Sequence, residues 1–131
     1  MIGEHNKENI AAAVAAAKIA GVRREIIKKA VANFKGLEHR LEFVRELAGV
    51  KYYDDSFATT PEATIIALKS FAAPIALLLG GADKQADFKQ LAKEVKRRVK
   101  CVILLNGHAT PRIKKELLKA GYENNKIKLV N

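Results

Sequence analysis

The chain has 131 residues, enough for one domain with a sizeable core, and 49% of them are hydrophobic, which excludes a disordered chain. A formal net charge of +10 permits an anionic partner, but the basic residues are dispersed and no aromatic stacking platform accompanies them, which disfavours a nucleic-acid-binding surface. The single cysteine, Cys101, excludes an internal disulfide, and no signal peptide or membrane span is recognisable, so we expect a cytoplasmic protein.

The first part of the chain is predicted to form two helices. Residues 5–21, HNKENIAAAVAAAKIAG, have Asn6 as a candidate cap and Gly21 as a stop. Residues 24–34 form the second helix, and their apolar side chains share one face: Ile26, Ile27, Ala30, Val31 and Phe34. The pattern breaks in KGLEHR, and we expect a domain boundary near Gly36.

Strands and helices alternate after that boundary. Two strands, LEFVREL and VKYYDD, are predicted to be joined at Ala48–Gly49. Pro61 opens a helix with Thr60 as its cap, and the helix runs to about Phe71.

Two continuous apolar runs, PIALLLGG at 74–81 and CVILLNG at 101–107, predict buried strands of a parallel sheet. A helix at 87–99 separates them, another helix opens at Thr110–Pro111, and residues 126–130 predict a last strand. This alternation indicates an α/β fold with a Rossmann-like, open and mostly parallel sheet that has helices on both faces.

Polar segments follow three of the predicted strands: Asp54–Ser56, Gly80–Lys84 and Asn106–His108. In open parallel sheets, ligands bind outside the carboxyl ends of the strands, so we expect these segments to share one edge. Gly80–Gly81 allow a sharp turn, and Asp83 and Lys84 would then place a charge pair there. An ordinary strand-to-helix turn with a surface salt bridge remains the alternative for Gly80–Lys84, and a solvated loop remains the alternative for Asp54–Ser56.

Two further groups are candidate ligand-binding residues. His39 and Arg40 lie at the expected boundary, where an arginine can clamp a phosphate, although a surface pair would look the same. Asn6 and Asn9 lie one turn apart and could hold a purine or a phosphate, while Asn6 as a plain cap remains possible. The spacing of the histidines and the cysteine matches no zinc pattern, and no nucleophile signature is present. Neither of the two common phosphate-binding loops, G-x-x-x-x-G-K-[ST] and G-x-G-x-x-G, occurs in the chain. We therefore predict no metal-ligating and no catalytic residue in this chain.

The order of these segments resembles the C-terminal part of the Mur ligases. The resemblance lies in GEHNKENIAAAVAAAKIAG, FKGLEHRLEFV, GVKYYDDSFATTPEAT and LLLGGADKQADF, and after about Val99 it rests on the fold pattern. Within the family, the chain is most similar to ligases that add D-glutamate to UDP-N-acetylmuramoyl-L-alanine in peptidoglycan synthesis. The resemblance implies an ATP-dependent enzyme that activates a carboxylate as an acyl phosphate, in a pathway that serves cell-wall biogenesis, cell shape and cell division.

The resemblance also implies how the chain is organised. Residues 1–35 correspond to the helical tail of the central ATPase domain, and residues 36–131 to the C-terminal Rossmann-like domain, whose end is expected to be missing. ATP with Mg is implied as cofactor, bound mainly by the central domain, so the 131 residues alone are expected to be inactive. A monomer with no nucleic-acid or membrane partner is expected.

Carried over residue by residue, the resemblance assigns two sets of contacts. The residues on the ATP side are Asn6, Asn9, His39, Arg40 and Asp55. The residues beside the incoming amino acid are Ser56, Thr59 and Lys84, and Lys84 is implied to hold a D-glutamate carboxylate.

One position departs from the family pattern. The commonest form of the loop reads D-S-K-A-T, and this chain has Phe57 in place of the lysine, which removes a cation from the D-glutamate side. The amino acid added therefore stays open. The alternatives are a sibling Mur ligase or a folylpolyglutamate synthase, which carry a histidine-containing loop at this point, and a stand-alone basic nucleotide- or nucleic-acid-binding domain.

Overall fold

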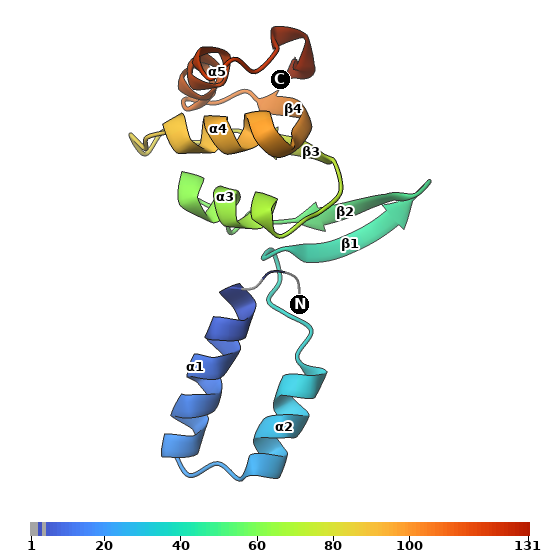
Figure 1. The fold of residues 1–131 in the computed structure, drawn as a ribbon, viewed down its shortest axis with the longest axis vertical. Helices are drawn as coiled ribbons and strands as arrows, with labels where there is room; N and C mark the ends of the chain where they lie inside the picture. Colours follow the sequence, from blue (N-terminus) through green and yellow to red (C-terminus); the bar gives the residue numbers. More distant parts are fainter. Residues whose placement is uncertain (1–2, 4) are drawn as a thin grey trace. The chain divides into compact units, whose positions relative to one another are not determined.

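The computed structural model describes residue 3 and residues 5–131, and the chain divides into two compact units, Met1–Phe57 and Ala58–Asn131 (Figure 1). The first unit contains helices α1 (His5–Ile19) and α2 (Arg24–Asn33) and strands β1 (Glu42–Leu47) and β2 (Val50–Asp54). None of the described helices combines the length and apolar character needed to cross a membrane.

Helices α1 and α2 lie side by side and run in opposite directions (Figure 1). Gly21 ends the first helix as predicted, with a φ of 77°, and Val22 N–H donates to the carbonyl of Ala17 at 3.0 Å. Asn6 is not the cap, because the helix already begins at His5 and the amide of Asn6 donates to the carbonyl of Gly3 at 3.2 Å.

The apolar face predicted for α2 remains largely open. Of its residues only Ile27 is buried, while Ile26, Val31 and the following Phe34 are exposed. These side chains line a groove of about 1040 Å³ together with Ile10 and other apolar residues of α1. The packing of the helical pair therefore leaves much of its apolar surface in contact with solvent.

Strands β1 and β2 form a two-stranded antiparallel sheet of their own, separate from the parallel sheet in which the sequence places them. Their turn is at Ala48–Gly49 as predicted, and both residues have positive φ, 49° and 77°. Two consecutive left-handed residues give a turn whose twist matches that of the flanking strands. The tight turn makes the pair antiparallel, since parallel strands need a longer crossover.

The second unit has a parallel sheet of β3 (Ile75–Leu79), β4 (Val99–Leu105) and β5 (Ile127–Val130), in that order. Its helices are α3 (Pro61–Lys69), α4 (Lys89–Arg98) and α5 (Thr110–Lys119), with a short 3₁₀ turn η1 (Asn124–Lys126) before β5. Thr60 caps α3 as predicted, because its side-chain oxygen accepts from the amide of Ala63 at 3.3 Å. The α/β class with a parallel sheet is confirmed.

Helical cover of the parallel sheet differs from the expectation. The helices α3, α4 and α5 share one core with one face of the sheet, and the buried side chains of this core include Leu68, Leu91, Val102, Leu104 and Leu117. The other face exposes Leu78, Leu105 and Val130. The strand order explains the difference: β3, β4 and β5 are added in one direction, and right-handed crossovers then place α4 and α5 on the same face.

Two neighbouring residues of β4 on opposite faces of the sheet allow a direct test of this one-sided packing. Leu104 is fully buried and Leu105 is 44% exposed. We expect Leu104→Ala to lower the free energy of unfolding of the second unit by about 2–5 kcal/mol, through lost burial and the cavity that remains. Leu105→Ala, the control on the other face, should cost well under about 1 kcal/mol. Urea denaturation of both variants measures this, and equal losses would show that the second face is as well packed as the first.

Candidate functional site

The predicted site residues are divided between the two units. Six of them belong to the first unit: Asn6, Asn9, His39, Arg40, Asp55 and Ser56. Thr59 and Lys84 belong to the second. Each group is described within its own unit.

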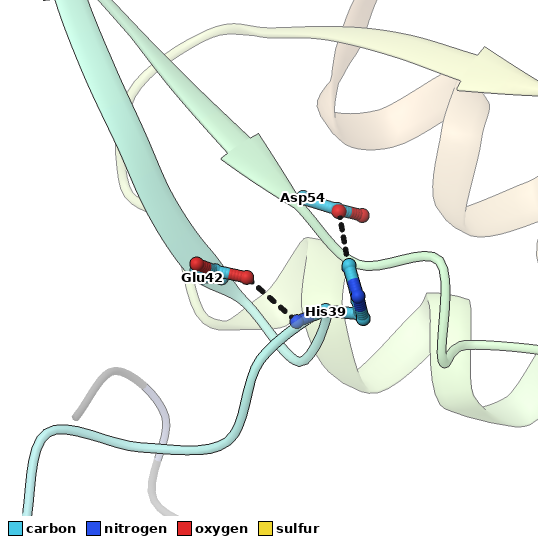
Figure 2. A group of neighbouring side chains, drawn as sticks. All are labelled: His39, Glu42 and Asp54. Atoms are coloured by element: carbon cyan, nitrogen blue, oxygen red, sulfur yellow. Dashed lines mark hydrogen bonds and ion pairs between the residues drawn. The ribbon is translucent and has the colours of Figure 1, made fainter.

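His39 is held at three points in the turn that leads into β1, and Figure 2 shows two of them, the contacts with Glu42 and Asp54. Its backbone N–H donates to Oε2 of Glu42 at 2.7 Å, and its ring Nδ1 lies 2.8 Å from Oδ2 of Asp54. Its carbonyl accepts from the amide of Phe57 at 3.0 Å. Glu42 begins β1 and Asp54 ends β2, so the hairpin carries two of the three groups that fix His39.

The two adjacent carboxylates Asp54 and Asp55 both bind the chain around them. Oδ1 of Asp54 accepts from the amide of Ser56 at 2.9 Å, and Oδ1 of Asp55 accepts from the amide of Leu41 at 3.0 Å. The bond to Leu41 joins the segment after β2 to a turn in which His39 and Leu41 have positive φ, 61° and 46°. A left-handed non-glycine residue costs on the order of 1–3 kcal/mol, so the turn needs such support.

The His39–Asp54 contact changes the acidity of both groups. The hydrogen bond from His39, followed by the bond from the amide of Ser56, lowers the pKa of Asp54 to about 2. The same hydrogen bond to Asp54 raises the pKa of His39 above its ordinary value. Both groups are therefore charged between the pKa of Asp54, about 2, and the raised pKa of His39, and the stabilising effect of the pair is lost as pH rises through the latter.

Cation binding by this cluster would disturb the arrangement that is seen. Among the described residues, His39, Glu42 and Asp54 form the group that resembles a metal site. One nitrogen or oxygen atom of each lies within 4.8 Å of the others, and these are residue types that ligate metals. A cation bound between them would have to displace the proton that Nδ1 shares with Asp54. The observed geometry is that of a hydrogen-bonded cluster.

A groove in the first unit brings three of the predicted nucleotide-side residues together. Asn6, Asn9 and Arg40 all line the space of about 1040 Å³ between α1, α2 and residues 34–43. Most of the other lining residues are apolar, with Glu38 and Glu42 among the exceptions. A few polar groups in a largely apolar hollow are the usual composition of a small-molecule site.

In the second unit, two of the three predicted sites meet at the carboxyl edge of the parallel sheet. A Cβ on Gly80 would come within 2.7 Å of the carbonyl oxygen of Leu105, and one on Gly107 within 2.7 Å of that of Gly81. The amide of Ala109 donates to the carbonyl of Gly81 at 3.1 Å. Glycine is thus required for the loops after β3 and β4 to touch. The third predicted site, Asp54–Ser56, follows a strand of the other sheet, so the expectation of one shared edge is wrong for it.

Arg112 holds the loop that carries Lys84, and sequence reasoning missed it. Its guanidinium lies 2.5 Å from Oδ1 of Asp83, donates to the carbonyl of Ala86 at 2.8 Å and stands 5.5 Å from the ring centre of Phe88. Asp83 therefore pairs with Arg112 and not with Lys84 as predicted. The signal available in the sequence was a basic residue directly after Thr110–Pro111, at the start of a helix.

The three remaining predicted site residues have exposed side chains. Lys84 makes no ion pair with any described residue, and Thr59 and Ser56 have exposed side chains. Lys84 is thus an exposed cation on the loop that Arg112 holds.

Comparison with known proteins places this geometry in a family. Residues 39–130 match the Mur ligase, glutamate ligase domain. The chain is 55% identical over 115 residues to the UDP-N-acetylmuramoylalanine–D-glutamate ligase of Roseiflexus sp. (strain RS-1), covering 88% of this chain and 25% of that protein. It is 41% identical over 129 residues to the ligase of the same name from Caldanaerobacter subterraneus, covering 98% and 28%. The chain thus spans about a quarter of the length of these relatives.

Solved structures agree with the fold. The UDP-N-acetylmuramate-alanine ligase of Thermotoga maritima superposes with a TM-score of 0.76 at 19% identity, over 99% of this chain and 30% of that one. The folylpolyglutamate synthase of Thermotoga maritima superposes with a TM-score of 0.68 at 20% identity, over 100% and 32%. At these identities the likeness concerns the fold alone.

The contacts of Arg112 predict the acidity of Asp83. The hydrogen bond from the Arg112 guanidinium is the largest cause of the lowered pKa of Asp83, and the hydrogen bond from the amide of Gln85 is the second. We expect Arg112→Ala to move the pKa of Asp83 up toward the ordinary value, because the amide of Gln85 and the smaller effect of His108 then remain to stabilise the carboxylate. An NMR pH titration of the aspartate carboxyl carbons measures this. Lys114→Ala removes the same charge from the same helix and should leave Asp83 unchanged; similar shifts in both variants would mean that net charge and not the contact sets the pKa.

Proposed function

The chain belongs to the Mur ligase family, and we propose that it forms the C-terminal part of an ATP-dependent ligase that joins D-glutamate to UDP-N-acetylmuramoyl-L-alanine in peptidoglycan precursor synthesis. The observation that carries the proposal is the 55% identity, over 88% of this chain, to a protein named for that activity. Residues 1–35 then belong to the central ATPase domain and residues 36–131 to the C-terminal domain. The site of action is the cytoplasm, where ATP and the nucleotide-linked substrate are found.

The nucleotide side of the proposed site consists of Asn6, Asn9, His39, Arg40 and Asp55. The groove that gathers Asn6, Asn9 and Arg40 supports this assignment, since amides suit a purine and a guanidinium suits phosphate oxygens. His39 adds a second basic group in the same turn, whose charged form the hydrogen bond to Asp54 favours by raising its pKa. Asp55 acts through the backbone in this arrangement, because its carboxylate accepts from the amide of Leu41. ATP with Mg is held mainly by the central domain.

The amino-acid side consists of Ser56, Thr59 and Lys84. D-glutamate brings two carboxylates, which call for cations and hydroxyl donors. Lys84 supports the assignment because it is exposed and because Arg112 fixes the loop that carries it. Phe57 stands where the family usually has a lysine, so Lys84 carries more of the charge recognition in this chain. In the proposed reaction the amine of D-glutamate attacks the acyl phosphate and inorganic phosphate leaves.

Lys84 provides the test of this function. A charge-assisted hydrogen bond to a carboxylate contributes roughly 1.5–3 kcal/mol. In a complete ligase containing this chain, Lys84→Ala should therefore raise the KM for D-glutamate by about 10- to 150-fold and change the KM for ATP much less. Steady-state kinetics with each substrate titrated in turn measures both constants.

The control for this test is Lys93→Ala, which removes another exposed lysine of the same unit and should leave both constants near wild type. An unchanged KM for D-glutamate in Lys84→Ala would show that Lys84 is a surface lysine. Turnover with another amino acid in preference to D-glutamate would instead favour a sibling ligase, the alternative that Phe57 keeps open.

A further inference from the structure

We propose that Asp54 is a positioning residue that holds the imidazole of His39 so that its Nε2 atom is left for a phosphate oxygen of the nucleotide. The identity of this ligand rests on the proposed function, in which His39 contacts ATP. The positioning itself rests on contacts within the first unit (Figure 2).

The two ring nitrogens of His39 have different surroundings: Nδ1 faces Asp54, and Nε2 is open. Nδ1 lies 2.8 Å from Oδ2 of Asp54, a distance typical of a charge-assisted hydrogen bond. Nε2 makes no hydrogen bond with any residue that the structure describes, and the side chain of His39 is 55% exposed. A ring anchored at one nitrogen and open at the other has the arrangement of histidines that bind a ligand through one atom and are oriented through the other.

Asp54 is itself held in place by the hairpin. It is the last residue of β2, it is paired in register with Glu42, and its Oδ1 accepts from the amide of Ser56 at 2.9 Å. Each oxygen of the carboxylate therefore has its own partner, one in the loop and one in the ring of His39. A carboxylate fixed in this way can fix the ring in turn.

The backbone of His39 is held by other groups. Glu42 accepts from its N–H, and the amide of Phe57 donates to its carbonyl. Position of the main chain and orientation of the ring are therefore set by different residues. Substituting Asp54 should release the ring, while the backbone of the turn keeps its bonds to Glu42, Phe57 and Asp55, which separates a positioning role from a merely structural one.

The protonation of the ring follows from the same contact. The charges that act on His39 come from Asp54 at the end of β2, Glu42 on β1 and Glu38 in the turn, and all three are carboxylates that favour imidazolium. When the ring is neutral, its remaining proton stays on Nδ1, because that atom faces a carboxylate acceptor. When the ring is charged, Nε2 carries a proton and can donate to a phosphate oxygen.

The first experiment needs no turnover. Imidazole nitrogen shifts of the 131-residue chain, followed through a pH titration by NMR, report the pKa and the tautomer of His39. We expect a raised pKa in the wild type and, at high pH, the proton on Nδ1. Asp54→Asn keeps an oxygen for the amide of Ser56 but can turn an amide N–H toward Nδ1, so the pKa should fall toward the ordinary value and the proton should move to Nε2.

Two further variants complete this experiment. Glu42→Gln keeps the bond to the backbone and should retain the Nδ1 tautomer, whereas Asp54→Ala should lose it. A neutral wild-type ring protonated on Nε2, or an Asp54→Asn variant with the tautomer and pKa of the wild type, would overturn the proposal.

The second experiment links the ring to the nucleotide. In a complete ligase containing this chain, Asp54→Asn should raise the KM for ATP about tenfold near neutral pH, with the KM for D-glutamate unchanged. The KM for ATP should also rise less with pH than in the wild type, because the neutral ring of the variant keeps a proton on Nε2 whereas the neutral wild-type ring keeps it on Nδ1. Glu46→Gln, on β1 but outside the cluster, is the control for lost charge.

The outcomes separate the two proposals. A wild-type KM for ATP and pH profile in Asp54→Asn would overturn the role of Asp54 even if the tautomer had changed. Failure of the proposed function would be seen differently, as absence of D-glutamate-dependent phosphate release from the unsubstituted enzyme. In that case the NMR result on the chain still decides whether Asp54 positions the ring.

Discussion

The first unit depends on two neighbouring carboxylates that support a strained turn. His39 and Leu41 both have left-handed backbones, which ordinary side chains adopt at a cost. Asp54 and Asp55 offset that cost by binding the ring of His39 and the amide of Leu41, while the amide of Phe57 holds the carbonyl of His39. The residues at the end of β2 are thus bonded to the turn that precedes β1, and these bonds orient the ring of His39.

In the second unit, the loop that carries the Lys84 ammonium is held in a comparable way. Lys84 has no ion pair among the described residues, but its neighbours Asp83, Ala86 and Phe88 all contact Arg112 of α5. The glycines at the ends of β3 and β4 let this loop lie against the next one. In both units the group proposed to meet substrate is left open, and a second charged residue holds the backbone or ring that carries it. Strain or exposure at the site is tolerated because contacts outside the site support it.

Local patterns predicted most elements correctly because they depend on neighbouring residues. Pro61 with its Thr60 cap, the stop at Gly21 and the Ala48–Gly49 turn follow from backbone preferences that the sequence states directly. The errors concern relations between distant residues. The sequence did not show that β1 and β2 pair only with each other, nor that the order of β3, β4 and β5 lacks the reversal needed to place helices on both faces.

The same limit applies to the site. Asp54 was recognised as one of a conspicuous pair, but its partner His39 is 15 residues away, and nothing local connects them. Arg112 is 29 residues from Asp83, and in the sequence it is only one of the dispersed basic residues. Composition could identify the residue types suited to phosphate and carboxylate. Which of them were already paired, and so unable to meet a ligand, could be learned only from the structure.

Phe57 shows how the site can vary on one side without changing the other. Its backbone amide donates to the carbonyl of His39, while its side chain is 64% exposed. The main-chain amide of this position would support His39 with either phenylalanine or the lysine usual in the family, while the ring of Phe57 also lies 6.3 Å from the ring of His39. Replacement of that lysine therefore removes a cation from the amino-acid side of the proposed site and preserves the turn that orients His39 on the nucleotide side.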